Sequence, residues 1–269
     1  MKVSFTTLSC PDWPWEKILD EAARLGYDGI EIRGIEGEMY LPKAKPFLPE
    51  NIDKTKMLLK QKNLKICCLD TSCSFHDKAT YNNYLQEGID TIDLAFKMEV
   101  PFIRVFGNSI PNLEEEEDVI NMISNAMNEL GHYAESKGVC VLIETHGDFA
   151  NTIRLLKVLE KVDSNSVGVL WDINHPYKAF SEPVEETYAR LKNYIKHTHI
   201  KDSIGVGKEA KLCMIGQGDM PIAQCIEILK QNGYNGWLSL EWEKKWHPEL
   251  EEPEIALEVY IRYIKNLMK

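Results

Sequence analysis

Short apolar runs alternate with segments of helical periodicity along the whole chain. Eight runs rich in β-branched residues have the length and composition of strands, at residues 2–9, 29–33, 64–70, 102–106, 139–144, 167–172, 195–200 and 237–242. After each run, apolar residues recur every three or four positions, which predicts helices at residues 15–25, 51–62, 81–98, 118–136, 153–162, 184–193, 221–232 and 253–268. This alternation indicates parallel strands joined by right-handed crossovers.

Eight strand–helix units are the number that a (β/α)8 barrel, the TIM barrel, requires. Such barrels often occupy a chain of this length as one unit, so residues 1–269 are predicted to form a single α/β domain of this class. An open doubly wound sheet shares the alternating pattern. The glycine fingerprint GxGxxG of its dinucleotide-binding members is absent, which favours the barrel.

Four residues of metal-ligand type end the last four predicted strands. They are Glu144, Asp172, His199 and Glu241. In a barrel the chemistry lies at the C-terminal ends of the strands, and the ends of neighbouring parallel strands converge there. Three carboxylates and one imidazole suit a single divalent cation such as Mn²⁺, Mg²⁺ or Co²⁺, and Zn²⁺ is also open. A cation would also offset the cost of burying the carboxylates.

Other polar residues near the strand ends are predicted to contact substrate. His146 shares a strand face with Glu144, where an imidazole can hydrogen-bond a substrate or transfer a proton at neutral pH. His175 lies three residues beyond Asp172, within reach of a substrate oxygen or a second metal. The remaining predicted contacts are Arg33, which ends the second strand, and His76 and Lys201, which follow the third and seventh strands.

Several polar residues near these sites allow two interpretations. His197, two residues before His199, either orients the site from beneath or is a core histidine with its hydrogen bonds satisfied. Lys201 and Asp202 either form an ion pair at the rim or contact substrate and support the histidine. Arg104 inside the fourth strand is expected to pair with a buried carboxylate such as Glu31. The long loop at residues 203–220 is expected to act as a lid.

The composition of the chain limits the kinds of partner that the protein is expected to bind. The net charge of −11, without a basic face, argues against nucleic acid. No apolar run is long enough to span a bilayer and no signal peptide is recognisable, so a cytoplasmic protein without a membrane partner is expected. The seven cysteines form no CxxC pair and are expected to be buried thiols. The acidic surface shows no obvious interface stripe, and a homo-oligomer is left open.

The chain resembles the xylose isomerase-like superfamily of sugar phosphate isomerases and epimerases over nearly its whole length. The motifs that carry the resemblance are IETHG at 143–147, WDINHP at 171–176, HTHIKD at 197–202, GQGD at 216–219 and LSLEWE at 238–243. The resemblance implies that the four ligand residues bind one divalent metal, commonly Mn²⁺. In ketose 3-epimerase members, the equivalents of Glu144 and Glu241 form an acid/base pair on opposite faces of an enediolate, and the equivalent of His175 contacts substrate.

The leading hypothesis is a divalent-metal-dependent sugar or keto-polyol isomerase/epimerase. It would act by proton abstraction next to a carbonyl and a metal-bound enediolate, with Glu144, Glu241 and His146 as catalytic residues. The alternative is a lyase or dehydratase, because the family resemblance extends to inosose dehydratases and to enzymes that cleave 3-keto-glycosides, C-glycosides included. There His146 would be the acid or base.

Two further function classes have less support. Metal-dependent AP endonucleases share the fold, but they use additional histidines, and the fourth strand is followed here by Gly107 and Asn108. The acidity of the chain also opposes DNA binding. A non-catalytic sugar- or metal-binding module is disfavoured because the whole ligand set is present. The expected partner is therefore a small carbohydrate substrate.

Overall fold

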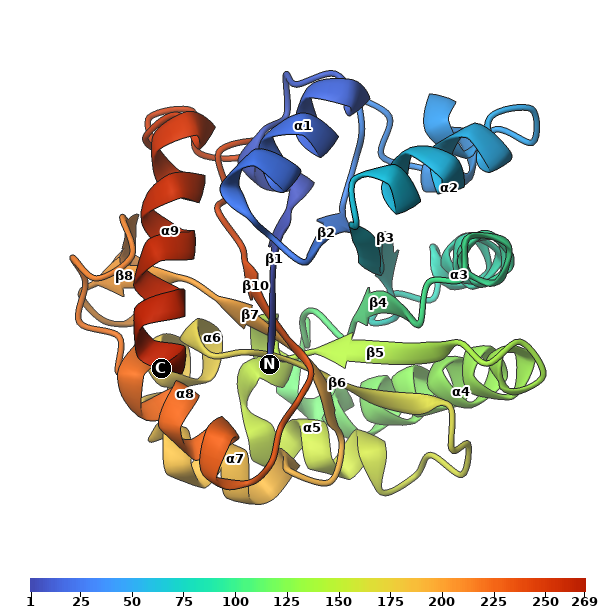
Figure 1. The fold of residues 1–269 in the computed structure, drawn as a ribbon. Coiled ribbons are helices and arrows are strands. Elements are labelled where there is room, and N and C mark those ends of the chain that lie inside the picture. Colours follow the sequence, from blue (N-terminus) through green and yellow to red (C-terminus); the bar gives the residue numbers. More distant parts are fainter.

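The strands of the barrel follow one another around a closed ring in chain order. In the computed structural model, which describes all 269 residues except the side chain of Lys208, each barrel strand pairs in parallel with its neighbours, and the last pairs with the first (Figure 1). The barrel strands are β1 (Lys2–Thr6), β2 (Gly29–Ile32), β3 (Lys65–Ser74), β4 (Phe102–Phe106), β5 (Cys140–Glu144), β6 (Val167–Asp172), β7 (Ile195–Ile200) and β10 (Trp237–Leu240). The predicted (β/α)8 fold is confirmed.

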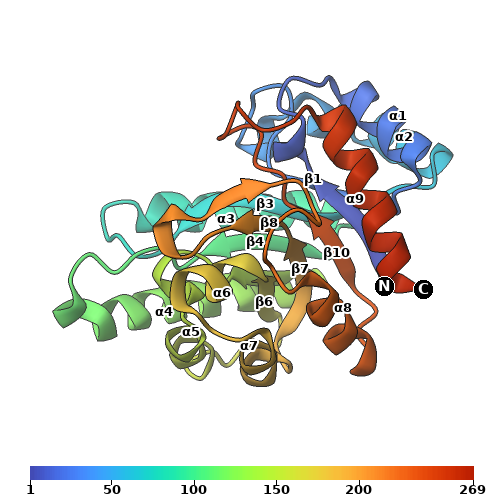
Figure 2. The same ribbon diagram turned by 90° about the vertical axis from the view of Figure 1, so that its left-hand side faces the viewer.

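The α-helices cover the outside of this barrel. They are α1 (Trp15–Leu25), α2 (Ile52–Gln61), α3 (Tyr81–Met98), α4 (Glu116–Glu135), α5 (Thr152–Leu159), α6 (Asn174–Phe180), α7 (Val184–Leu191), α8 (Ile222–Gln231) and α9 (Pro253–Met268). The last helix, α9, lies beside α1 and β1 in both views and so joins the two ends of the chain (Figures 1 and 2). Among the described helices, none combines the length and apolar character needed to cross a membrane.

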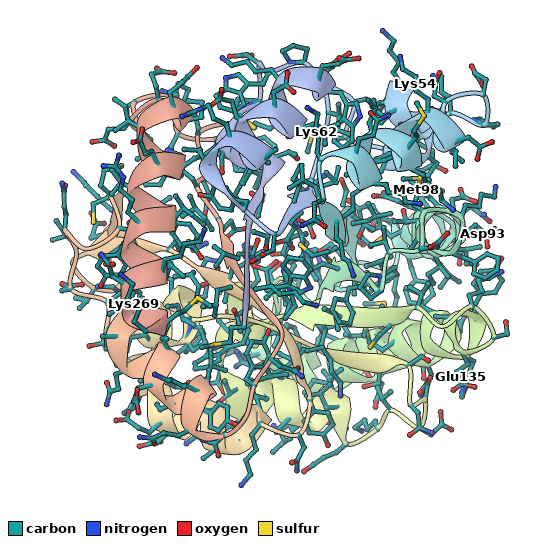
Figure 3. All side chains as sticks on the ribbon, in the orientation of Figure 1. Lys54, Lys62, Asp93, Met98, Glu135 and Lys269 are labelled. Carbon is teal, nitrogen blue, oxygen red and sulfur yellow. The ribbon has the colours of Figure 1, made fainter. Side chains whose placement is uncertain are left out.

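The apolar core lies between the strands and the helices. In α1 the residues that face the barrel are Trp15, Ile18, Leu19 and Ala22, all of them buried. Every residue of β6 is buried, because its outer face meets helices and its inner face fills the barrel. Each large apolar side chain that is fully buried contributes about 1.5–3 kcal/mol. Charged side chains such as Asp93 and Glu135 lie on the outer helices (Figure 3).

The element boundaries agree closely with those expected from the pattern, with a few differences. Helices α1, α3 and α9 match to the residue, whereas the first strand ends at Thr6 because Thr7–Ser9 form a 3-10 helix. Helix α6 was not predicted, because its seven residues include a proline and carry no apolar repeat long enough to recognise. The short antiparallel hairpin of β8 (Asp202–Ile204) and β9 (Lys211–Cys213) was not predicted either.

The hairpin belongs to the loop predicted as a lid, and it is fastened to the barrel. Asp202 turns away from Lys201 and accepts hydrogen bonds from the backbone N–H groups of Gly216 at 2.8 Å and Gly218 at 3.0 Å. On the other side, the buried Lys178 of α6 pairs with Asp219. The expected rim ion pair between Lys201 and Asp202 is therefore wrong, and the function of the loop as a lid stays a prediction.

Two loops at the C-terminal end of the barrel contact each other through their backbones. The N–H of Asp148 donates to the carbonyl of Asn108 at 2.7 Å, and the Asp148 carboxylate accepts from the N–H of Ile110 at 2.7 Å. Gly147 permits this approach, because it has φ +58° and a Cβ at this position would overlap the Asn108 carbonyl oxygen. The contact fixes the backbone next to His146.

Replacing Gly147 by alanine is expected to lower the free energy of unfolding by about 3 kcal/mol, since left-handed strain adds to a backbone overlap. Gly138→Ala is the matched control. Gly138 has φ +65°, and a Cβ added there would meet nothing within 4 Å, so only the strain of about 1 kcal/mol applies. Urea unfolding followed by circular dichroism measures both, and equal losses would contradict the proposed overlap.

Candidate metal centre

The four predicted ligands lie together at the C-terminal end of the barrel. Glu144 and Asp172 end β5 and β6, His199 is the penultimate residue of β7, and Glu241 directly follows β10. All four side chains are buried, and one ligand-type atom from each lies within 4.8 Å of those of the others. Convergence of the strand ends is therefore observed as expected.

The imidazole of His199 directs one nitrogen at the three carboxylates. Its Nδ1 is 3.3 Å from Glu241 Oε1, 3.7 Å from Glu144 Oε1 and 3.9 Å from Asp172 Oδ2. Metal–oxygen and metal–nitrogen bonds of about 2.1 Å place ligand atoms about 3–4 Å apart around one ion, so these separations fit a divalent cation. Nδ1 is buried and has no hydrogen-bond partner among the described residues, as expected of an atom that binds a metal.

Asp172 has a second role as the N-terminal cap of α6. Its Oδ1 accepts hydrogen bonds from the backbone N–H of Asn174 at 2.7 Å and of His175 at 3.3 Å. One oxygen thus holds the helix start, and Oδ2 remains for the metal. Burial, opposed by Lys201 and assisted by the neighbouring carboxylates, raises the pKa of Asp172 to about 7. A cation at this position would keep the carboxylate ionised.

Lys201 is a buried cation inside the site. Its Nζ lies 2.5 Å from Glu241 Oε2, 2.7 Å from Glu243 Oε1 and 2.9 Å from Asp172 Oδ2. Because Lys201 contacts Oε2 of Glu241 whereas His199 faces Oε1, the ammonium group and a metal can share this carboxylate. Lys201 therefore neutralises part of the acidic cluster and also reaches the Nε2 of His175 at 3.2 Å.

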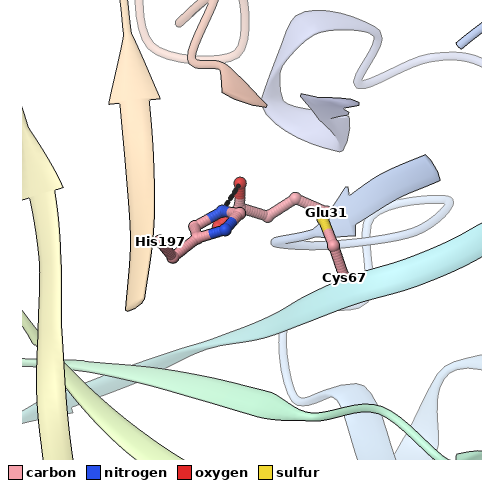
Figure 4. A group of neighbouring side chains, drawn as sticks. All are labelled: Glu31, Cys67 and His197. Carbon is pink, nitrogen blue, oxygen red and sulfur yellow. Dashed lines mark hydrogen bonds and ion pairs between the residues drawn. The ribbon is translucent and has the colours of Figure 1, made fainter. Parts of the chain in front are cut away.

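Beneath the four ligands, Glu31 bridges two histidines. His199 Nε2 lies 3.0 Å from one carboxylate oxygen of Glu31, and His197 Nε2 lies 2.9 Å from the other (Figure 4). A carboxylate accepts hydrogen bonds only, so Nε2 of His199 carries a proton, and Nδ1 is the nitrogen that a metal would bind in place of a second proton. Burial opposes ionisation of Glu31, but the two imidazoles hold its pKa well below the usual range. His197 thus supports the site from beneath, one of the two roles predicted for it.

Cys67 lies beside Glu31 and His197, and the three could in principle hold a soft cation (Figure 4). The Cys67 thiol instead donates to the carbonyl of Ile30 at 3.4 Å, while the Glu31 carboxylate is occupied by its two histidines. Burial raises the pKa of this thiol well above its ordinary value, which disfavours the thiolate that a metal requires. The group formed by Cys67, Glu31 and His197 is therefore better explained as a hydrogen-bonded cluster with a protonated thiol than as a metal site.

Arg104 pairs with buried carboxylates, as expected, but Glu31, the example given, is not one of them. Its guanidinium contacts Glu144 Oε2 at 3.1 Å and Asp70 Oδ2 at 3.4 Å. Asp70 stands directly opposite Arg104 in the β3–β4 register, whereas Glu31 faces the histidines of β7. Burial and Glu241 oppose ionisation of Glu144, yet Arg104 and His199 lower its pKa on balance. Sequence reasoning missed Asp70, although its place in a buried strand was a signal.

Two histidines lie above the ligands. The rings of His146 and His175 meet edge to face with centroids 4.8 Å apart, and His146 also packs against Phe106 at 4.6 Å. His146 Nδ1 is buried without a hydrogen-bond partner among the described residues. Burial lowers the pKa of both imidazoles, so both are neutral at pH 7. The structure thus brings both predicted residues to the metal position.

Two other predicted contacts lie elsewhere. Arg33 is buried after β2 and donates from Nη2 to Ser72 Oγ at 3.0 Å. His76 bonds Ser74 Oγ at 3.0 Å and lines an open hollow of about 530 Å³ beside α4. Among the described residues lining that hollow, none is a predicted metal ligand, and a substrate contact by His76 stays a prediction.

Glu31→Gln is expected to weaken metal binding by about 10–100-fold, the range seen when a group that orients a metal ligand is lost. An amide cannot accept from both imidazoles, so one ring must change its tautomer. Titration calorimetry with Mn²⁺ and with Zn²⁺ measures the effect. Glu50→Gln, at an exposed position, is the control. Unchanged affinity in Glu31→Gln would remove the orienting role of this carboxylate.

Comparison with known proteins places the chain in a family. Residues 19–264 match the profile of the xylose isomerase-like TIM barrel. The chain is 28% identical to an inosose dehydratase of Clostridium botulinum, covering 94% of this chain and 89% of that protein. It is 25% identical to a fructoselysine 3-epimerase of Escherichia coli, covering 90% of each.

The IOLI protein with a bound zinc atom has a similar structure, with a TM-score of 0.84 at 18% identity over 99% of this chain and 98% of that one. At this identity the likeness shows the fold alone. The two enzyme classes predicted from the sequence, isomerase/epimerase and lyase, both occur among the named relatives. The chain belongs to the xylose isomerase-like TIM barrel family.

Proposed function

We propose that this protein is a divalent-metal-dependent isomerase or epimerase of a sugar or keto-polyol. The observation that carries the proposal is the buried group of Glu144, Asp172, His199 and Glu241, arranged so that one imidazole nitrogen faces three carboxylates. A divalent cation bound there would supply a Lewis acid that polarises a carbonyl and an adjacent hydroxyl. The four residues are proposed as its ligands, and Mn²⁺ as the ion.

The two glutamates are proposed to carry the proton. Glu144 and Glu241 come from different strands, β5 and the end of β10, and both lie beside Nδ1 of His199. One carboxylate removes the proton next to the substrate carbonyl and keeps it, and the other, in its protonated form, delivers its own proton to the opposite face or the neighbouring carbon; exchange with solvent then restores both groups. Arg104 and Lys201 hold one oxygen of each carboxylate and so fix the direction of the other.

His146, His175 and Lys201 are proposed to hold substrate oxygens. The neutral imidazoles can donate or accept a hydrogen bond, and the Lys201 ammonium can donate one while it remains paired with Glu243. Lys201 is buried and His146 is half-buried, so this layer partly covers the space above the carboxylates.

A lyase or dehydratase is the second candidate, and the position of His146 favours it. Elimination needs a group that protonates the departing oxygen, in addition to the base next to the carbonyl. A neutral imidazole with a free Nδ1 beside the acidic cluster can meet that need. The inosose dehydratase relative shows that this reaction class occurs in the family, and it is proposed here only as the alternative.

Glu144→Gln is expected to reduce solvent-deuterium exchange at the substrate α-carbon by about 10²–10⁴-fold, because an amide cannot take the proton. Exchange is followed by NMR in D2O with ketoses, inososes and 3-keto-glycosides as substrates. The control is Glu160→Gln, at an exposed position just after α5. Chelator-treated wild-type protein should also lose exchange. Full exchange in Glu144→Gln would remove its assigned role.

His146→Gln separates the two reaction classes. An isomerase should keep α-carbon exchange within about tenfold while KM rises, because the amide still hydrogen-bonds substrate. A dehydratase should keep exchange but lose its unsaturated product, which mass spectrometry detects. Formation of that product by the wild-type protein would show that the protein is a lyase.

The expected cytoplasmic location, the single-domain organisation and the oligomeric state stay predictions.

A further inference from the structure

Two buried cations lie near the mouth of the barrel, and their surroundings differ. Lys201 has carboxylate oxygens of Asp172, Glu241 and Glu243 within 2.9 Å. Arg33 is only 9% exposed, yet among the described residues no carboxylate oxygen lies within 4.0 Å of its guanidinium. Lys201 is thus in direct contact with three carboxylates, whereas Asp70 and Glu87 lie near Arg33 without contacting its guanidinium.

The hydrogen bonds of Arg33 are incomplete. Nη2 donates to Ser72 Oγ at 3.0 Å, and the Ser72 backbone is itself held by Glu87 at 2.6 Å. Nη1 is buried and has no partner among the described residues. Burial and the nearby Arg104 guanidinium lower the pKa of Arg33 to about 10, so it stays charged at neutral pH. A buried charged group with an unpaired hydrogen-bond donor is costly unless a ligand provides the missing acceptor.

Arg33 lies at the C-terminal end of β2. Glu31, two residues earlier, points into the barrel and contacts His199, and β2 ends at Ile32, so Arg33 directly follows the strand at the end of the barrel where the four residues converge. Around the ring, the proposed metal ligands come from β5, β6, β7 and the end of β10, and strands β1 to β4 contribute none of the four. Arg33 therefore lies at the same end of the barrel as the ligand group, in the half of the ring that contributes no ligand.

We propose that Arg33 binds an anionic group, a carboxylate or phosphate, at the end of the substrate remote from the reacting carbonyl. The planar guanidinium fork matches two oxygens of such a group. Ser72 Oγ adds a hydroxyl beside it. The repulsion of the acidic cluster would keep the anionic end on the β2–β3 side and the carbonyl end over the four ligands. The substrate class is then an acidic or phosphorylated ketose or keto-polyol. The placement of the substrate carbonyl rests on the proposed function, whereas the binding of an anionic group by Arg33 does not.

The first test uses anion binding and needs no turnover. Inorganic phosphate and acetate are titrated into wild-type protein, Arg33→Met and Arg24→Met at constant ionic strength set with sodium chloride. Arg24 is an exposed arginine of α1 paired with Glu21 and serves as the matched control. At about 100 times its dissociation constant, the preferred anion should raise the Tm of the wild type and of Arg24→Met by about 5 °C and leave Arg33→Met unchanged.

Stability without added anion distinguishes ligand binding from a structural role. Removing an uncompensated buried charge should leave the Tm of Arg33→Met equal to or above that of the wild type. Three outcomes would overturn the proposal. The Tm of Arg33→Met without anion could fall by several degrees, the anion could still raise the Tm of Arg33→Met, or the anion could leave the Tm of the wild type unchanged. The variant Arg33→Lys keeps the positive charge but lacks the two parallel N–H donors of the guanidinium. It should bind the anion at least tenfold more weakly even if Arg33→Met does not fold.

A substrate pair tests the same assignment during turnover. The α-carbon exchange rate of a neutral ketohexose is compared with that of its 6-phosphate and of a keto-sugar acid. The kcat/KM advantage of the anionic compound should exceed tenfold and disappear in Arg33→Met. The failures are separable. Anion binding through Arg33 without any exchange contradicts the proposed reaction alone, whereas exchange on neutral ketoses without anion binding contradicts the Arg33 proposal alone.

Discussion

Compensation of buried negative charge is the constraint on which the rest of this structure depends. Carboxylates crowd the C-terminal half of the barrel interior, each almost inaccessible to solvent: Glu31, Asp70, Glu144, Asp172 and Glu241. An isolated buried carboxylate is prohibitively costly, so each one requires a nearby cation or hydrogen-bond donor. The protein supplies two histidines, an arginine and a lysine. The group of three carboxylates around His199 remains, and we propose that a divalent cation completes it.

The barrel meets this requirement by stacking polar side chains in layers. Because successive inward residues on a strand are two positions apart, each ligand has an inward neighbour one layer above or below. Glu31 and His197 lie beneath His199 and hold its ring, while His146 and Lys201 lie above. In the proposed function the lower layer sets the affinity for metal and the upper layer sets what happens to the substrate. The two tasks would then be open to separate variation on one scaffold.

This separation explains why the family covers more than one reaction. The relatives include an epimerase and a dehydratase, and proton abstraction beside a carbonyl is common to both. The outcome depends on which groups stand above the carboxylates to return a proton or release a leaving group. Fold and metal site alone do not select between these outcomes. In this chain we propose that the selection depends on His146, His175, Lys201 and Arg33.

The sequence by itself determined the barrel and the four-residue group at its end. Strand and helix periods are local properties, and Glu144, Asp172, His199 and Glu241 converge in any barrel built from those strands. Partners across the barrel were not predictable in the same way. They depend on the stagger between strands, including the register shift between Ile30 and Glu31.

A pattern of period two contains no information on that stagger. The sequence therefore indicated a buried carboxylate partner for Arg104 but not that Asp70 and Glu144 would fill this role. Tertiary structure likewise decided the hydrogen bonds of Asp202, the start of helix α6 and the incomplete pairing of Arg33. Local sequence determined which residues reach the end of the barrel, and packing decided which charges they meet there.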